Sequence, residues 1–178
     1  ICFELYSQAP YFSNELINKQ FLSTPIKTAR KALLRNLLEN EHLEDLEFPQ
    51  DKFPPQKAIY ISLLKQTGLH QKNKKLGYFK IDKPSKNSTF FGLWTVSENF
   101  LNSCLSNKRN LNEFYELLES NPFKLKKGFI DFWIPMFLIA QKEDFALFHA
   151  DGGFIPFLSE DTLDLMYKKP QDFLIKRY

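Results

Sequence analysis

The stretch PFKLKKGFIDFWIPMFLIAQKEDFALFHADGGFIPFLSEDTLDLMYKK, residues 122–169, decides the fold predicted for this chain. Between Phe129 and Ala140 its only polar residue is Asp131, and a helix that is apolar on nearly all sides is typical of one enclosed by other elements. A transmembrane span is not favoured, because a span needs roughly 20 apolar residues and charged residues follow Gln141. Pro135 predicts a helix that either starts late or is kinked, because an internal proline removes a backbone donor.

A β-hairpin and a second helix follow this apolar segment. Residues 145–148 and 154–158 are rich in aromatic and branched side chains, and the DGG sequence at 151–153 favours a tight turn between them. Pro156 cannot donate to a strand ladder, so either the second strand lies at a sheet edge or its proline lies on the outward side. Ser159 and the acidic pair after it are typical of a capped helix start. We therefore predict a mainly α protein with small β elements (α+β), a helical domain with a winged-helix-like helix/β-hairpin/helix unit.

Helical spacing recurs in the rest of the chain. Ser13 predicts the cap of a short helix over residues 13–20, and Thr24-Pro25 begins the next helix. That second helix carries an apolar stripe that consists of Ile26, Ala29, Arg30, Leu33, Leu34, Leu37 and Leu38. Further helices are expected from Pro54-Pro55 to Gly68, over residues 88–105 with Cys104 and Leu105 in the buried stripe, and over residues 111–118.

These elements suggest three segments of one compact body. Residues 1–53 form an N-terminal helical segment with an acidic linker, residues 54–121 a helical subdomain with a lysine-rich strand or loop, and residues 122–178 the winged-helix-like hairpin unit. With 178 residues and 43% hydrophobic content, the chain can bury a substantial core. Because the chain starts without methionine and closes on a strand-like segment, we expect it to be an excised piece of a longer protein.

Net charge and cysteine content say little about the partner or the cellular compartment of this protein. The formal net charge of +3 is too mild to indicate a nucleic-acid partner by itself. Two cysteines far apart, Cys2 and Cys104, favour neither a disulfide framework nor a metal site, and a buried Cys104 is expected to act as a small hydrophobe. We expect a cytoplasmic protein without a membrane partner.

The region from residue 39 to residue 51 is acidic. It carries Glu39, Glu41, Glu44, Asp45, Glu47 and Asp51, and it contains no lysine or arginine. Paired carboxylates can bind a metal or act as acid and base, but those functions need burial or convergence. We interpret the segment mainly as a solvated connection.

A basic patch follows, and it is the strongest candidate for a binding site. It consists of Lys65, Lys72, Lys74, Lys75, Tyr78, Lys80, Lys83 and Lys86, with Phe79 among them and Asp82 as the one opposing charge. Lysines interleaved with aromatics can follow a phosphate backbone. The alternative is a solvated loop whose two aromatics fill the core.

Motifs that identify a reaction are absent from the sequence. It contains no GxxxxGK[ST], GxGxxG, GxSxG, HExxH or CxxC, so no catalytic residue, metal site or cofactor is predicted. His149 and Asp151 form the one close pair of histidine and carboxylate, and a turn exposed to solvent is a poor place for a general base. A site assembled from distant residues stays open.

Several segments carry a family resemblance. The order FPPQKAIYISLLKQTGLH, LWTVSENFL, PFKLKKGFIDFWIPMFLIA and DFALFHADGGFIPFLSEDTLDLMYKKPQDFLIK resembles a region of large bacterial ATP-binding proteins of phage-defence type, such as the P-loop ATPase subunits of BREX-like systems. The resemblance covers residues 54 onward and implies an internal, non-catalytic region downstream of an ATPase core. The nucleotide-binding loop is not in this sequence, so no ATP-binding residue carries over.

Two functions follow as expectations. The first is a non-catalytic accessory domain that contacts other domains of its parent chain or protein subunits. The second is a nucleic-acid-binding module that uses the lysine-rich segment 65–86. An enzyme with a dispersed site is the least favoured alternative.

Overall fold

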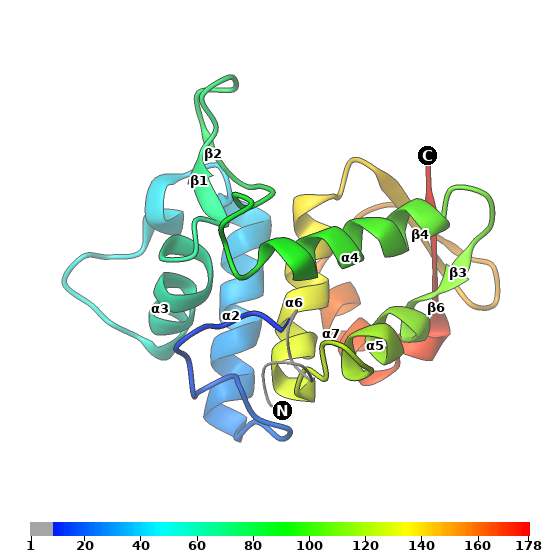
Figure 1. Ribbon diagram of the computed structural model, residues 1–178, viewed down its shortest axis with the longest axis horizontal. Helices are drawn as coiled ribbons and strands as arrows, with labels where there is room; N and C mark the ends of the chain where they lie inside the picture. Colours follow the sequence, from blue (N-terminus) through cyan, green and yellow to red (C-terminus); the bar gives the residue numbers. More distant parts are fainter. Residues whose placement is uncertain (1–8) are drawn as a thin grey trace.

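A computed structural model describes residues 9–178 and confirms a mainly helical α+β architecture (Figure 1). The helical elements are α2 (Thr24–Asn40), the 3-10 turn η1 (Glu44–Glu47), α3 (Pro55–Tyr60), the π-helical turn η2 (Ile61–Lys65), α4 (Phe91–Ser103), α5 (Leu111–Glu119), α6 (Lys127–Ala140), α7 (Glu160–Lys168) and the 3-10 turn η3 (Pro170–Asp172). The strands are β1 (His70–Lys72), β2 (Phe79–Ile81), β3 (Arg109–Asn110), β4 (Phe145–His149), β5 (Phe154–Ile155) and β6 (Phe173–Arg177). None of the helices within residues 9–178 has the length and apolar character needed to cross a membrane.

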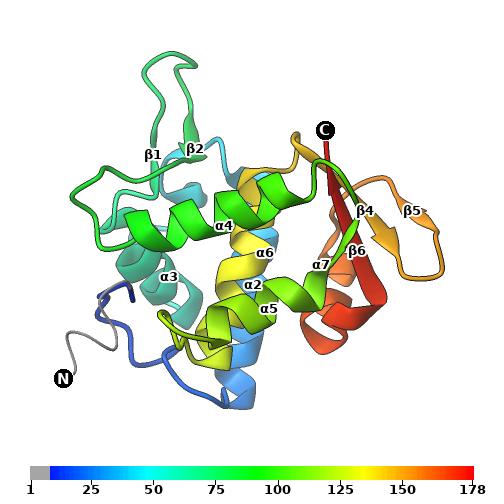
Figure 2. The same cartoon turned by 45° about the vertical axis from the view of Figure 1, so that its right-hand side comes forward.

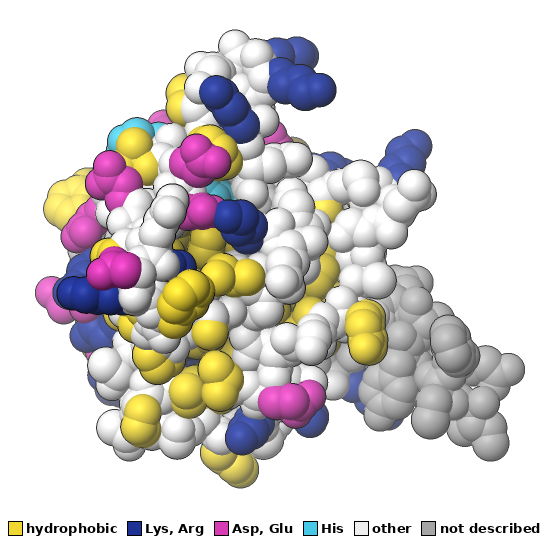
Figure 3. All heavy atoms as spheres, turned by 90° about the vertical axis from the view of Figure 1, so that its left-hand side faces the viewer, with side chains coloured by type: hydrophobic (Ala, Val, Ile, Leu, Met, Phe, Trp, Pro, Cys, Tyr) yellow, Lys and Arg dark blue, Asp and Glu magenta, His cyan; other side chains and the backbone are white. Residues whose placement is uncertain are grey.

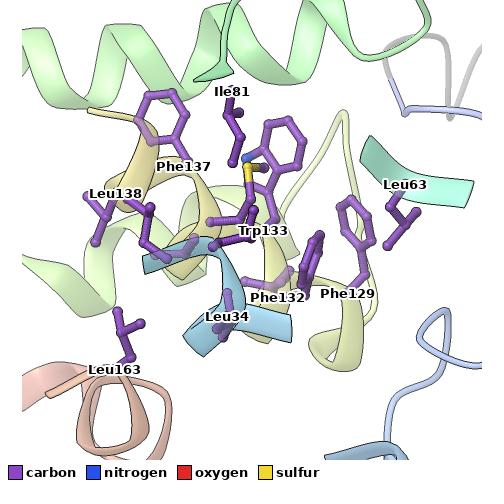
Figure 4. Packing of buried hydrophobic residues seen from close by; sticks show 14 of the residues in the cluster. Leu34, Leu63, Ile81, Phe129, Phe132, Trp133, Phe137, Leu138 and Leu163 are labelled. Atoms are coloured by element: carbon purple, nitrogen blue, oxygen red, sulfur yellow. The ribbon is translucent and has the colours of Figure 1, made fainter. Parts of the chain in front are cut away.

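Helix α6 is the centre of the structure. Every residue from 128 to 139 is buried, as the all-round apolar pattern predicts. The helix starts at Lys127 and continues through Pro135, so the alternative of a late start is wrong. Side chains from other elements converge on α6 (Figure 4), among them Leu34 from α2, Ile81 from β2 and Leu163 from α7.

Trp133 of α6 lies at the middle of an aromatic cluster. Its ring centroid is 5.7 Å from that of Phe90 and 6.3 Å from that of Trp94. Its indole Nε1 donates a hydrogen bond of 2.9 Å to the hydroxyl of Ser97, which is buried on α4. The polar end of a fully buried tryptophan is therefore satisfied inside the core.

The predicted helix, hairpin and helix follow one another in α6, β4–β5 and α7 (Figure 2). Gly152 adopts a φ of +99° in the hairpin turn, and the Ser159 hydroxyl accepts from the Thr162 amide at the start of α7. Strand β5 lies at the edge of the antiparallel sheet β3-β6-β4-β5, the first of the two alternatives that Pro156 allows. It ends at Ile155, three residues earlier than expected, because Pro156 has no backbone donor with which to extend the ladder.

Two other predictions are wrong in detail. Residues 13–20 form a turn in which the Asn14 side chain accepts from the Leu16 and Ile17 amides, because so short a helix is marginal without packing support. Helix α4 ends at Ser103, which leaves Leu105 48% exposed, although Cys104 is buried as predicted.

Candidate functional site

Strands β1 and β2 form a hairpin that projects from the helical body (Figures 1 and 2). His70 pairs with Ile81 at its base, and Lys72 pairs with Phe79 toward its tip. The Asn73 side chain accepts from the amides of Lys75 and Leu76, and Gly77 adopts a φ of +80°. The tip is therefore a defined turn with a side-chain cap.

The hairpin separates the predicted basic residues into two groups. Lys72, Lys74, Lys75 and Tyr78 are exposed near its tip, and Lys80 lies on β2. Lys65 lies on η2 and Lys83 follows β2, and both contribute to ion pairs, with Asp45 at 2.6 Å and Glu98 at 2.5 Å. Lys86 is exposed in the loop before α4.

The tip combines positive charge with apolar surface. Leu76 is 50% exposed and Tyr78 is 47% exposed. Within residues 9–178, Lys72, Lys74 and Lys75 have no acidic side chain within ion-pair distance. Basic side chains stand out where the hairpin projects at the top of the space-filling view (Figure 3). Such a surface can contact an apolar or an anionic partner.

A buried polar network holds the base of the hairpin. His70 Nε2 lies 2.7 Å from the carbonyl oxygen of Glu41, which can only accept, so Nε2 carries a hydrogen. Burial lowers the pKa of His70, which favours the neutral ring, and its Nδ1 then accepts from the Tyr60 hydroxyl at 2.9 Å. Asp45 Oδ1 lies 3.2 Å from the same hydroxyl. Protonation of the ring would reverse this chain, with Nδ1 donating to Tyr60 and Tyr60 donating to Asp45.

Next to this network the backbone is strained. Asp45, Leu46 and Glu47 have φ angles of 49°, 52° and 55°, in the left-handed region that costs a non-glycine residue roughly 1–2 kcal/mol. The turn is held by the burial of Leu46 and by the ion pair between Lys65 and Asp45. The interpretation of residues 39–51 as a solvated connection is thus wrong for this part, because the turn packs against the core.

The other side of the hairpin borders a cleft of about 340 Å³. Glu41 connects the two walls of this cleft. Its Oε1 accepts from the Ile81 amide of β2 at 3.1 Å, and its Oε2 pairs with Lys142, which follows α6, at 3.4 Å. The Phe79 amide donates to the carbonyl oxygen of His42 at 3.2 Å. The hairpin is therefore attached to the C-terminal end of α2 by backbone and side chain.

Sequence analysis did not identify the residues at the base of the hairpin. Glu41, Asp45, Tyr60 and His70 come from separate segments, and no local motif joins them. One signal was present, because an acidic run at 39–51 precedes a basic run at 65–86, and opposite charges favour contact between the two.

The histidine and cysteine side chains of the described residues form neither a metal site nor a reactive thiol. Within residues 9–178, no three His, Cys, Asp or Glu side chains converge on a possible metal position. Cys104 is buried and burial raises the pKa of its thiol, so the nucleophilic thiolate is disfavoured. Cys2 lies outside the described residues, and His149 is exposed at the β4–β5 turn.

Comparisons with family models, with curated proteins and with solved structures give no match to this chain.

Proposed function

We propose that this chain is a non-catalytic accessory domain of a larger bacterial ATP-binding protein, and that the β1–β2 hairpin makes its contact with another domain or subunit. One observation carries the proposal: Leu76 and Tyr78 are about half exposed at the end of a projecting hairpin. Exposed apolar side chains on a projection, next to cations, are typical of a contact surface. The resemblance to phage-defence ATPases supports the choice of parent protein.

The anchoring of the hairpin supports a role in transmitting a contact to the core. Its base is joined to the C-terminal end of α2 through Glu41 and to α3 through Tyr60, and the Tyr60 hydroxyl lies 3.2 Å from Asp45 of η1. A force on the tip therefore acts on α2, which packs on α6, and on α3, which packs on α2. Within the parent protein, we propose that this path relays the state of the ATPase to its neighbours.

A photo-crosslinking experiment tests the contact. The full reading frame that contains this segment is expressed with a benzophenone amino acid in place of Tyr78, and in a second sample in place of Leu105. Leu105 is the matched control, because it is 48% exposed and lies on another part of the surface. We expect one dominant crosslinked peptide from position 78, located in another domain or subunit, and no comparable product from position 105. Equal or absent crosslinking at the two positions would overturn the proposal.

An assay of ATP turnover tests the non-catalytic part of the proposal. The purified chain of residues 1–178 is expected to give no hydrolysis above a buffer control. Turnover that follows a single folded species through size-exclusion chromatography would show that the chain is itself an enzyme.

The lysines at the tip favour a second candidate, a nucleic-acid contact. Helix α6 occupies the place of a recognition helix in the winged-helix-like unit, and burial of residues 128–139 leaves it no side chain with which to read bases. A nucleic acid would instead bind through Lys72, Lys74 and Lys75, without sequence preference. If these three lysines each neutralise one phosphate of duplex DNA, three counterions are released on binding. The affinity for DNA should then be about 40-fold weaker at 200 mM than at 50 mM salt.

A filter-binding titration with DNA and RNA at these two salt concentrations tests the second candidate. The triple variant Lys72→Gln, Lys74→Gln, Lys75→Gln should lose the salt-sensitive binding. The control Lys52→Gln, Lys124→Gln, Lys169→Gln removes the same charge from exposed lysines outside segment 65–86 and should keep it. No binding by the unchanged chain at low salt would exclude a nucleic-acid partner.

A further inference from the structure

A second polar region lies away from the hairpin, in a cleft of about 220 Å³ bordered by α2, α6 and α7, which contact one another. Lys27, Arg30, Lys127 and Lys168 line it, with Asp131 as the one carboxylate. The cleft faces the first half of α2, whereas the hairpin is attached at the C-terminal end of that helix. The two sites can therefore be tested separately.

Arg30 is the deepest cation of this cleft and is only 3% exposed. The ring of Tyr167 covers one face of its guanidinium, with the Cζ atom 4.1 Å from the ring centroid. Its ion pair with Asp131 joins Nη1 to Oδ2 at 3.5 Å, which is longer than the 2.7–2.9 Å typical of a charge-assisted hydrogen bond. A guanidinium has five N–H donors, and within residues 9–178 this ion pair is the one contact of the Arg30 side chain with an acceptor.

The charges around Asp131 do not balance. Its Oδ1 already accepts from Lys127 at 2.7 Å, and Lys27 lines the same cleft. One carboxylate thus faces three cations, an excess of two positive charges. Lys168 lies at the rim, where it pairs with Asp164 at 2.6 Å.

Two further features lie next to these cations. Within residues 9–178, the buried Tyr115 hydroxyl has no hydrogen-bond partner, and the ring of the same residue lies 5.5 Å from Lys127 Nζ. Buried polar groups are nearly always satisfied, so an orphan hydroxyl beside a charged cluster points to a missing group. Lys127 and Gly128 also begin α6, so the positive end of the helix dipole lies beside the cleft, with the Lys127 amide bonded to Gln20 Oε1 and the Gly128 amide to the Lys19 carbonyl oxygen.

We infer that the cleft between α2, α6 and α7 binds a phosphate group, held by Lys27, Arg30 and Lys127 with Lys168 at the rim. A dianion matches the excess of two positive charges, whereas a carboxylate would neutralise only half of it. Tyr167 then keeps Arg30 in place by stacking on its guanidinium, and Asp131 aligns Arg30 with Lys127. This site is independent of the partner that contacts the hairpin.

Calorimetric titration with inorganic phosphate tests the inference on the purified chain, against sodium acetate and sodium chloride at matched ionic strength. Phosphate should bind saturably near one equivalent and raise the melting temperature, and the other two anions should not. The variant Lys27→Gln should weaken phosphate binding about tenfold or more, the loss expected for a charge-assisted hydrogen bond. Lys27 is exposed and is not part of the core, so this variant is expected to fold.

The control variant Lys72→Gln removes the same charge from the hairpin tip and should bind phosphate as the unchanged chain does. The variant Lys168→Gln provides a second test, because loss of this cation at the rim of the cleft should also weaken phosphate binding. No saturable phosphate binding, equal affinity for acetate, or equal loss in Lys27→Gln and Lys72→Gln would each overturn the phosphate site without affecting the proposal for the hairpin.

Discussion

The substitution Gly128→Ala tests the packing of the N-terminal segment on α6. A Cβ atom at residue 128 would lie 2.4 Å from the Lys19 carbonyl oxygen, 2.7 Å from Leu22 Cδ2 and 2.9 Å from the Ile17 carbonyl oxygen. Two of these three atoms belong to the backbone, which cannot move aside by a change of rotamer. The Gly128 amide also donates to the Lys19 carbonyl oxygen at 2.9 Å, so any shift that relieves the clash lengthens this hydrogen bond.

The expected cost follows from these contacts. Overpacking of a tight site costs about 1–3 kcal/mol, and a weakened backbone hydrogen bond adds about 1 kcal/mol. The higher helix propensity of alanine offsets about 1 kcal/mol. We therefore expect a net loss of about 2 kcal/mol in the free energy of unfolding.

Urea denaturation followed by tryptophan fluorescence measures this change. With a slope of about 2 kcal/mol per molar urea, the midpoint should fall by about 1 M. The control Gly153→Ala places a Cβ no closer than 3.5 Å to any neighbour and should change stability by less than about 0.5 kcal/mol. Coincident midpoints for Gly128→Ala and the unchanged chain would refute the packing of residues 17–22 on α6.

Three further predictions concern buried polar groups and caps. Ser97→Ala should cost about 1–3 kcal/mol in urea denaturation, because the buried Trp133 Nε1 loses its acceptor, and an unchanged midpoint would contradict the hydrogen bond. Asn110→Ala should cost about 0.5–2 kcal/mol through loss of the α5 capping box, whereas Asn112→Ala, which loses only an exposed contact, should be nearly neutral in the same assay. Since burial lowers the pKa of His70 below its usual 6.5, the unfolded chain binds the proton first, and stability should fall as the pH drops below about 6.5. Urea midpoints measured from about pH 7.5 to pH 5 should show this decrease, reduced in His70→Gln, and an identical slope in both proteins would contradict the assignment.

The core helix, the β4–β5 turn and the α7 cap could be predicted because each depends on neighbouring residues. An all-round apolar run, a glycine at positive φ and a serine before an acidic turn are local features with local physical causes. The same locality explains the failures. Residues 13–20 carry a helix cap pattern, but the contact with Gly128 and the Asn14 side chain satisfy their backbone in another way.

The candidate sites were only partly predictable. The composition of residues 65–86 predicted a basic patch. It could not show that Lys65 and Lys83 lie away from the hairpin tip, because their positions depend on ion pairs with Asp45 and Glu98. The phosphate cleft had a signal that sequence analysis did not use. Arg30 is the one charged member of an apolar stripe and Asp131 is the one polar residue between Phe129 and Ala140, and a charge in such a position is rarely buried without a partner.

The amino-acid sequence by itself determined most of the helices from Thr24 onward, the β4–β5 turn and the buried face of α2, because side-chain periodicity and backbone preference act over a few residues. Only the tertiary structure decided that β6 lies between β3 and β4, that Arg30 meets Asp131 and that an acidic turn holds the base of a basic hairpin. Such contacts join residues far apart in the chain, and their geometry depends on how whole elements pack around α6, which no local pattern encodes.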